Sequence, residues 1–252
     1  MAANYTLVMR PWDLFRFSTR WIYADEEFRS ELLQHHLHGL TDLSSPGFGT
    51  PVTSHRSSWV TTWKTDSNTY YIKTYDYPTW RDRSRGIGRN TLFARSRPHR
   101  EQLALNWLRE NGFGGPRARG VAESRSLGML RRAVLVTEAW PGETMADLLP
   151  RLDPTGTDQL IECLTALVHR LHHAGFRDRN LDLRNLLARR EDGGWKIVKV
   201  DSPRFRLARA GRERDRLARA DWQRLARSLD EIGMRLEAPG LVASQSAPGS
   251  PT

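Results

Sequence analysis

The most informative stretch of this chain is Gly175-Phe176-Arg177-Asp178-Arg179-Asn180-Leu181-Asp182-Leu183-Arg184-Asn185-Leu186-Leu187, with Lys199-Val200-Asp201 shortly after it. It places many polar and ionisable side chains in one short loop. A strongly amphipathic helical pattern precedes the loop, and two short apolar runs follow it. Loops carried on rigid elements are where binding and catalytic residues are usually found. We therefore expect this loop to carry the chemistry of the protein.

The elements around the loop can be predicted from the hydrophobic pattern. A helix is predicted for about residues 158–174, because its apolar residues recur as on one face of an α-helix. They are Leu160, Ile161, Leu164, Leu167, Val168 and Leu171. Gly175 stands where helices commonly end. Residues 186–187 and 195–200 are strand candidates that flank a Gly-rich turn, which is typical of a hairpin. A last helix is predicted for about residues 213–235.

The first half of the chain has a β pattern. Residues 59–63 and 69–75 are rich in β-branched and aromatic residues and are separated by a polar turn, which predicts a hairpin. A helix is predicted to begin near Ser96, with Pro98 in its first turn. A buried strand follows at residues 133–137, and a short helix at 146–149. This order predicts an α+β fold in which a small β-rich lobe, 51–138, precedes a mostly helical lobe, 139–238.

Both ends of the chain are less clear. Residues 1–50 contain many aromatic side chains, which indicates packing, but their role stays open. Residues 239–252 are mostly Ala, Ser, Pro and Gly, which predicts disorder. The single cysteine, Cys163, excludes an intrachain disulfide. We found no signal-peptide pattern and no apolar run of the roughly 18 residues that would span a bilayer, and we therefore expect a cytoplasmic location.

The chain carries a formal charge of +10 and a pI near 10.4. Such an excess indicates a polyanionic partner: nucleic acid, an anionic membrane surface or a phosphorylated substrate. A general compositional bias toward arginine is the alternative. Residues 81–100 are especially basic, either as a solvated face or as a clamp for an acidic glycolipid or for anionic lipid headgroups.

Phosphoryl transfer from a nucleotide needs few protein groups: a cation on the phosphates, an anion that fixes this cation, oxygen ligands for magnesium, and a group that positions the acceptor hydroxyl. Candidates for the first three occur in the required order. Lys73 lies toward the end of a predicted strand, and Glu101 lies early in the next helix. Asn185 and Asp201 flank the predicted hairpin, and their oxygen atoms suit magnesium.

The order and local sequence resemble the protein-kinase fold, and most closely the bacterial lipopolysaccharide core kinases, the Kdo/heptose kinase family. The resemblance covers about residues 54–229. It implies that Lys73 binds nucleotide phosphates with Glu101 as its partner, that Glu138 ends the hinge, and that Asn185 and Asp201 hold Mg²⁺. Residues 54–60 stand where a loop covers the phosphates, and they lack the glycines of ordinary kinases.

The chain departs from that family at the catalytic triplet. Asn180 stands five residues before Asn185, where the resemblance implies a catalytic aspartate. An amide cannot take a proton as a carboxylate does, although it can orient a hydroxyl. Since phosphoryl transfer depends mainly on positioning and electrostatics, catalysis is not thereby excluded. Asp178 and Asp182, each two residues away, are alternative sources of the missing carboxylate.

The resemblance therefore implies a kinase that uses ATP and Mg²⁺ and phosphorylates a sugar hydroxyl of the lipopolysaccharide inner core, as a peripheral protein at the inner face of the cytoplasmic membrane. Its expected partners are ATP and an acidic glycolipid, with Asn180, Asp178 or Asp182 positioning the acceptor. The alternative is a pseudokinase scaffold with impaired catalysis. A nucleic-acid-binding protein would rest on charge alone, and no recognised motif supports it.

Overall fold

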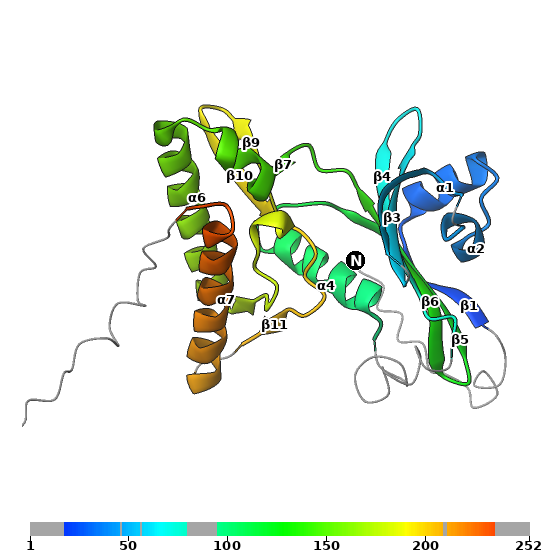
Figure 1. Cartoon of the computed structure of the whole chain (residues 1–252). Coiled ribbons are helices and arrows are strands. Elements are labelled where there is room, and N and C mark those ends of the chain that lie inside the picture. Colours follow the sequence, from blue (N-terminus) through cyan, green and yellow to red (C-terminus); the bar gives the residue numbers. More distant parts are fainter. Residues whose placement is uncertain (1–17, 46, 56, 80–94, 209–210, 235–252) are drawn as a thin grey trace, which may run out of the picture. The chain divides into compact units, whose positions relative to one another are not determined.

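A computed structural model describes residues 18–45, 47–55, 57–79, 95–208 and 211–234. The chain forms two compact units (Figure 1). The first unit consists of the chain up to Gly112 together with Pro116–Trp140, and the second of Phe113–Gly115 and the chain from Pro141 onward. Most of the basic segment at 81–100 and all of the predicted disordered tail lie outside the described residues.

The first unit is built on one antiparallel sheet of six strands in the order β1-β5-β6-β4-β3-β2. The strands are β1 (Ser18–Ala24), β2 (Thr50–His55), β3 (Ser58–Lys64), β4 (Thr69–Asp76), β5 (Ala118–Ser126) and β6 (Met129–Glu138). Its helices are α1 (Glu26–Gln34), α2 (Leu40–Leu43) and α4 (Arg97–Glu110). The predicted hairpin is therefore confirmed as β3 and β4.

Helices cover both faces of this sheet, with α1 and α2 on one side and α4 on the other (Figure 1). Successive side chains of a strand point to opposite faces, so a doubly covered strand is apolar throughout. On β6, Val134 and Val136 pack with Phe28 of α1, whereas Leu135 packs with Leu105 of α4. The sequence predicted residues 133–137 of β6 because they are mostly apolar, and it left out residues 129–132, which include two arginines.

Residues 18–45, whose role was open from the sequence, belong to the first unit. β1 pairs with β5 at the edge of the sheet, and Asp25 then caps α1 by accepting a hydrogen bond from the amide of Phe28 at 2.9 Å. Phe28 makes edge-on ring contacts with Trp21, Trp63 and Tyr70. The aromatic residues that indicated packing thus close one face of the sheet.

The second unit is mostly helical. Its long helices are α6 (Pro154–His173) and α7 (Arg212–Asp230), preceded by α5 (Met145–Leu148) and the 3₁₀ turn η2 (Leu149–Arg151). One small sheet has the order β10-β9-β7 and another pairs β11 with β8. The strands are β7 (Glu143–Thr144), β8 (Phe176–Arg177), β9 (Leu186–Glu191), β10 (Gly194–Lys199) and β11 (Arg206–Leu207), and the 3₁₀ turn η3 spans Leu183–Asn185.

The predicted helices of this unit are confirmed, with shifted ends. α6 begins at Pro154, earlier than predicted, because the carboxylate of Asp153 caps it by accepting a hydrogen bond from the amide of Gly156 at 2.7 Å. Gly175 follows α6 with a φ of 87°, a conformation that glycine adopts without steric cost. α7 ends at Asp230 rather than near 235. The hairpin around residues 191–194 is confirmed as β9 and β10.

None of the helices in the described ranges combines the length and the hydropathy that a membrane-spanning segment requires.

Candidate active site

The first unit pairs Lys73 with Glu101. The Lys73 Nζ atom lies 3.1 Å from Glu101 Oε2 and 3.4 Å from Oε1. The Glu101 side chain is 6% exposed, whereas that of Lys73 is 22% exposed, so the ammonium group keeps access to solvent. Burial alone would lower the pKa of Lys73, but Glu101 and Tyr75 together outweigh it and the pKa is raised. The result is a fixed cation that can meet an anionic ligand.

The secondary structure explains why these two residues meet. On β4, Tyr70 and Ile72 point into the cluster beneath α1 and α2, so Lys73 points to the opposite face of the sheet, where α4 packs. The Ser96 hydroxyl caps α4 by accepting a hydrogen bond from the amide of His99 at 3.2 Å. This start places Glu101 in the second turn, on the buried side of the helix.

Glu138, the predicted hinge residue, ends β6 in a network of charges. Its carboxylate pairs with Arg119 of β5 at 2.5 Å, and the same guanidinium contacts Asp25 at 2.9 Å and Glu27 at 2.8 Å. Its amide donates to the carbonyl of Arg117 at 2.9 Å. The carboxylate of Glu138 is therefore engaged in a charge network that links β6 to β5 and to the start of α1.

The second unit brings Asn180, Asn185 and Asp201 together. The Asn180 Nδ2 amide donates to the Asp201 carbonyl at 2.9 Å and to Asp201 Oδ2 at 3.0 Å. Asn185 Nδ2 donates to the Asn180 carbonyl at 3.2 Å, and the Val200 amide donates to the Asn185 carbonyl at 2.9 Å. Asp201 has a φ of 55°, which is uncommon outside glycine and is typical of functional sites.

These residues fit a magnesium ion. Mg²⁺ prefers oxygen ligands and is usually held by one or two protein groups together with substrate phosphates. Asp201 supplies a carboxylate and Asn185 an amide oxygen, and among the described residues nothing donates a hydrogen bond to that amide oxygen. The same ranges contain no group of three or more His, Cys, Asp and Glu that would form an all-protein metal site. The donor set is therefore that of a nucleotide-associated cation.

Asp178 lies in a different environment. Its carboxylate is 2% exposed and forms an ion pair with Lys199 Nζ at 3.0 Å, and the Lys199 side chain is itself only 1% exposed. Burial raises the pKa of the Asp178 carboxyl, although the Lys199 ammonium works against the rise. Lys199 also donates to the carbonyls of Val200 and Asp201. Lys199 thus links the Asp178 carboxylate to the backbone around Asp201.

Asp182 is engaged with its own loop. One carboxylate oxygen accepts from the amide of Arg184 at 3.1 Å, which starts the turn η3. Both oxygens also accept from the Arg184 guanidinium, at 3.0 and 2.9 Å. These bonds to Arg184 lower the pKa of Asp182, despite the opposing effect of partial burial. The Asp182 carboxylate is therefore a turn-forming group in this state.

Asp221 of α7 is a site residue that the sequence analysis missed. Its buried carboxylate accepts hydrogen bonds from the amides of Asp178 at 3.1 Å and Arg179 at 2.9 Å. The same carboxylate contacts His172 Nε2 at 3.2 Å. Arg179 has a φ of 59°, so Asp221 holds a loop turn that would otherwise be unfavourable. Only its position inside the apolar stripe of α7 hinted at a buried role.

We predict that Lys73→Met weakens nucleotide binding about tenfold, because a charged hydrogen bond to a phosphate contributes roughly 1.5–3 kcal/mol. Isothermal titration with ADP and magnesium measures the change. Lys64→Met is the matched control, since Lys64 is an exposed residue at the end of the neighbouring strand β3. Equal affinities of the two variants would contradict a phosphate-binding role for Lys73.

Comparisons with known proteins identify the family and the fold. Residues 52–239, more than half of the chain, match the model of the lipopolysaccharide kinase (Kdo/WaaP) family. A search of curated proteins found no match. Among solved structures, the chain is similar to WaaP in complex with acyl carrier protein, with a TM-score of 0.58 and 16% identity, over 85% of this chain and 83% of that one.

A second similar structure is the Rio2 kinase–ADP/Mg²⁺–phosphoaspartate complex from Chaetomium thermophilum, with a TM-score of 0.52 and 16% identity. The match covers 76% of this chain and 59% of that one. At such identities the two structures establish the fold alone. The predicted α+β protein-kinase-like fold and the family resemblance are both confirmed.

Proposed function

The chain belongs to the lipopolysaccharide kinase (Kdo/WaaP) family, and on this premise we propose that it transfers a phosphoryl group from ATP to a Kdo or heptose hydroxyl of the lipopolysaccharide inner core. The family establishes a kinase that acts on a sugar. The observation that carries the proposal is the cluster of Asn180, Asn185 and Asp201, where two magnesium-type ligands adjoin a group able to orient a hydroxyl. The acceptor would be reached at the cytoplasmic membrane face.

The residues have distinct roles in this proposal. Lys73, fixed by Glu101, holds nucleotide phosphates, and Asn185 and Asp201 hold Mg²⁺. The ion, when bound, neutralises charge on the phosphates. Glu138 would contribute through its backbone carbonyl, because its carboxylate is paired with Arg119 and its amide donates to Arg117. These groups act by positioning and by electrostatics, which dominate phosphoryl transfer.

Asn180 would orient the acceptor hydroxyl by hydrogen bonding. Its amide nitrogen donates to Asp201, which leaves its amide oxygen for an incoming O–H donor. No proton is transferred to an amide in this arrangement, so the hydroxyl proton leaves to the phosphate or to water. Asp178 and Asp182 are weaker candidates, because Lys199 and Arg184 already hold their carboxylates.

The same observation supports a second candidate function, a pseudokinase scaffold. With Asn180 bound to Asp201, the chain has no carboxylate at the acceptor position. A scaffold would bind nucleotide weakly or not at all. A thermal-shift titration with ATP and magnesium distinguishes the two functions in part, because a ligand that binds only the native state raises the unfolding midpoint. An unchanged midpoint at millimolar ATP favours the scaffold.

The decisive test of kinase function is phosphate transfer from ATP to deacylated core oligosaccharide. We predict that Asp201→Ala lowers turnover about a hundredfold, in line with the upper range for groups that support a metal site. Asp192→Ala is the control, since Asp192 lies in the turn between β9 and β10. Equal turnover by the wild type and Asp201→Ala would refute the proposed kinase function.

A further inference from the structure

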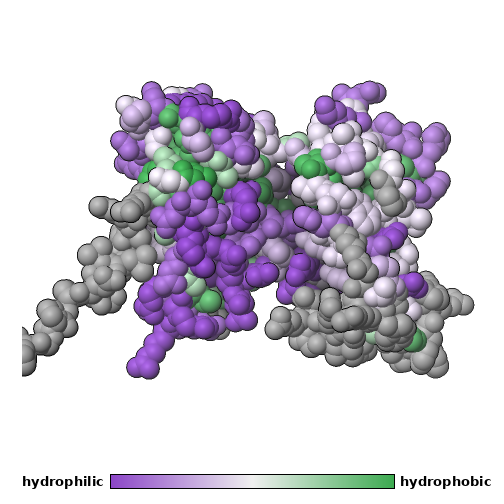
Figure 2. All heavy atoms as spheres, viewed as in Figure 1, coloured by the Kyte–Doolittle hydropathy of each residue, from purple (hydrophilic) through white to green (hydrophobic). Residues whose placement is uncertain are grey.

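Arginine side chains form a line along the exposed face of α7, the orange helix of Figure 1. Arg212, Arg216, Arg219 and Arg227 lie within about 80° of one another around the helix axis and extend over about 22 Å. All four are exposed, and the opposite face carries the buried residues, including Leu217. We call these four residues the α7 arginine stripe. Figure 2 shows a predominantly hydrophilic surface over this helix.

Little negative charge within the described ranges balances the stripe. Arg212, Arg216 and Arg219 have no carboxylate within ion-pair distance among these residues. The two acidic side chains in the first turns of α7 are paired elsewhere: Glu213 with Arg206 at 3.2 Å, and Asp215 with Arg214 at 3.3 Å. Asp230, Glu231 and the buried Asp221 complete the acidic groups on and next to this helix. The stripe is thus a row of cations without internal partners over most of its length.

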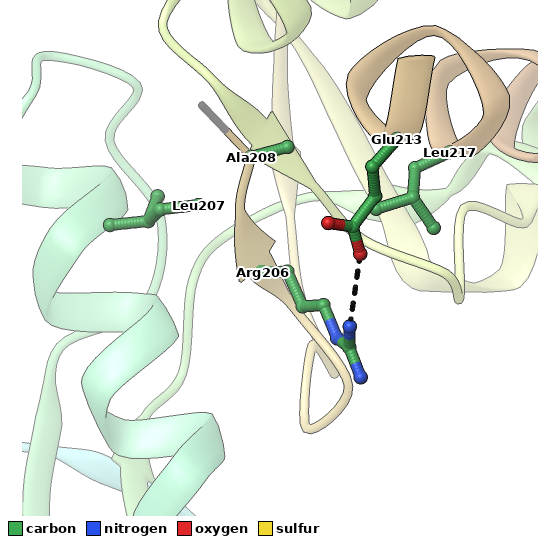
Figure 3. A pocket seen from close by; sticks show the side chains of 5 residues that line it. All are labelled: Arg206, Leu207, Ala208, Glu213 and Leu217. Carbon is green, nitrogen blue, oxygen red and sulfur yellow. Dashed lines mark hydrogen bonds and ion pairs between the residues drawn. The ribbon is translucent and has the colours of Figure 1, made fainter. Parts of the chain in front are cut away.

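A pocket lies beside the first turns of α7. This pocket, of about 430 Å³, is lined by Arg206, Leu207, Ala208, Glu213 and Leu217 (Figure 3). Leu207 is 52% exposed, and the ion pair of Arg206 with Glu213 ties the chain before α7 to the first turn of the helix. Its lining combines the aliphatic side chains of Leu207 and Leu217 with the charged side chains of Arg206 and Glu213.

We propose that the α7 arginine stripe docks the protein on an anionic lipid surface, with the arginines contacting phosphate headgroups. The proposal rests on the proposed function, since a core glycolipid acceptor lies in a membrane, and it names the surface that reaches that membrane. A straight row of cations on a convex helix can meet a planar surface along its whole length. Each arginine then adds to the attraction independently.

The observations favour lipid over nucleic acid. Single-stranded nucleic acid is usually bound by aromatic platforms interleaved with positive charge. The aromatic residue of α7, Trp222, is buried on the opposite face, where it packs against His169 and His172. The stripe therefore presents exposed cations without an exposed aromatic side chain on α7.

The test is sedimentation with vesicles of phosphatidylglycerol and phosphatidylcholine, using the full chain. The stripe variant is Arg212→Gln with Arg216→Gln and Arg219→Gln. The matched control also removes three positive charges from exposed residues of the second unit: Arg151→Gln, Arg190→Gln and Lys196→Gln. At about one kcal/mol per arginine, the stripe variant should bind vesicles about a hundredfold more weakly, and the control should lose less than tenfold.

Two further measurements make the result decisive. A variant with lysine in place of Arg212, Arg216 and Arg219 keeps the three positive charges, and its binding to vesicles should persist. Turnover on soluble deacylated acceptor should be unchanged in the stripe variant, so failure of docking is distinguishable from failure of the kinase proposal. Equal loss in stripe and control variants overturns the inference, as does equal binding to pure phosphatidylcholine. Stripe-dependent binding to homopolymeric RNA, without vesicle binding, also overturns it.

Discussion

Asn180→Asp should raise phosphate transfer to the core oligosaccharide by about a hundredfold to ten-thousandfold, the range that a positioned general base contributes. Asn180 adjoins both candidate magnesium ligands, so a carboxylate there could accept the proton of a hydroxyl bound beside them. Steady-state turnover at saturating ATP and magnesium measures the effect. An unchanged or lower rate would mean that the amide itself is the group that the reaction uses.

The same substitution has a second expected result, which does not depend on catalysis. It removes two hydrogen bonds to Asp201, at 2.9 and 3.0 Å, and places two carboxylates side by side. Like charges at this distance destabilise each other unless a cation lies between them. We therefore expect a lower unfolding midpoint without metal and a larger stabilisation by Mg²⁺ than in the wild type.

Asn111→Asp is the matched control for both readouts. Asn111 lies exposed at the end of α4, where its amide donates to the carbonyl of Trp107 at 2.8 Å. The Asn111→Asp variant replaces an amide with a carboxylate, as Asn180→Asp does, but at a position away from the candidate metal ligands. The magnesium response of this variant should equal that of the wild type, and an equal increase in both variants would assign the effect to net charge instead of to the cluster.

The sequence predicted those elements whose own pattern determines them. α6 and α7 each bury one apolar stripe, and β3, β4 and β6 are rich in β-branched or aromatic residues, so the local signal agrees with the final structure. β5 was missed because its sequence, ARGVAESRS, reads as polar. Its Arg119 and Glu123 are nevertheless buried, since Arg119 pairs with Asp25 and Glu138 and Glu123 pairs with Arg125. Only long-range pairing explains such a strand.

The candidate site likewise contains residues that a local pattern identifies and residues that only long-range contacts identify. Asn185 and Asp201 were predicted from their oxygen donors beside a hairpin, and Asn180 from its place in the family resemblance. Asp221 was missed because it stands about forty residues after the loop, in a helix without a local motif. The partners of Asp178 and Asp182 could not be predicted either. Whether Lys199 or Arg184 reaches a carboxylate depends on burial and loop geometry, which spacing along the chain does not encode.

Lys199→Met should lower the free energy of unfolding by about 3–5 kcal/mol, the loss expected when one partner of a buried ion pair is removed. The pair is nearly inaccessible to solvent, with side-chain exposures of 1% and 2%, so water cannot replace the ammonium beside the Asp178 carboxylate. Burial already raises the pKa of this carboxyl. Urea unfolding at neutral pH measures the change.

Two further variants make this prediction specific to the pair. Lys196→Met alters the same strand, but Lys196 is 45% exposed and its ion pair with Glu191 should contribute less than about 1 kcal/mol. The double variant Lys199→Met with Asp178→Leu removes both charges and should recover most of the loss, because well-packed apolar residues often replace a buried pair without cost. A double variant less stable than Lys199→Met alone would show that Asp178 contributes through other contacts. Recovery of stability without recovery of turnover would identify Lys199, through its bonds to the carbonyls of Val200 and Asp201, as the residue that positions Asp201.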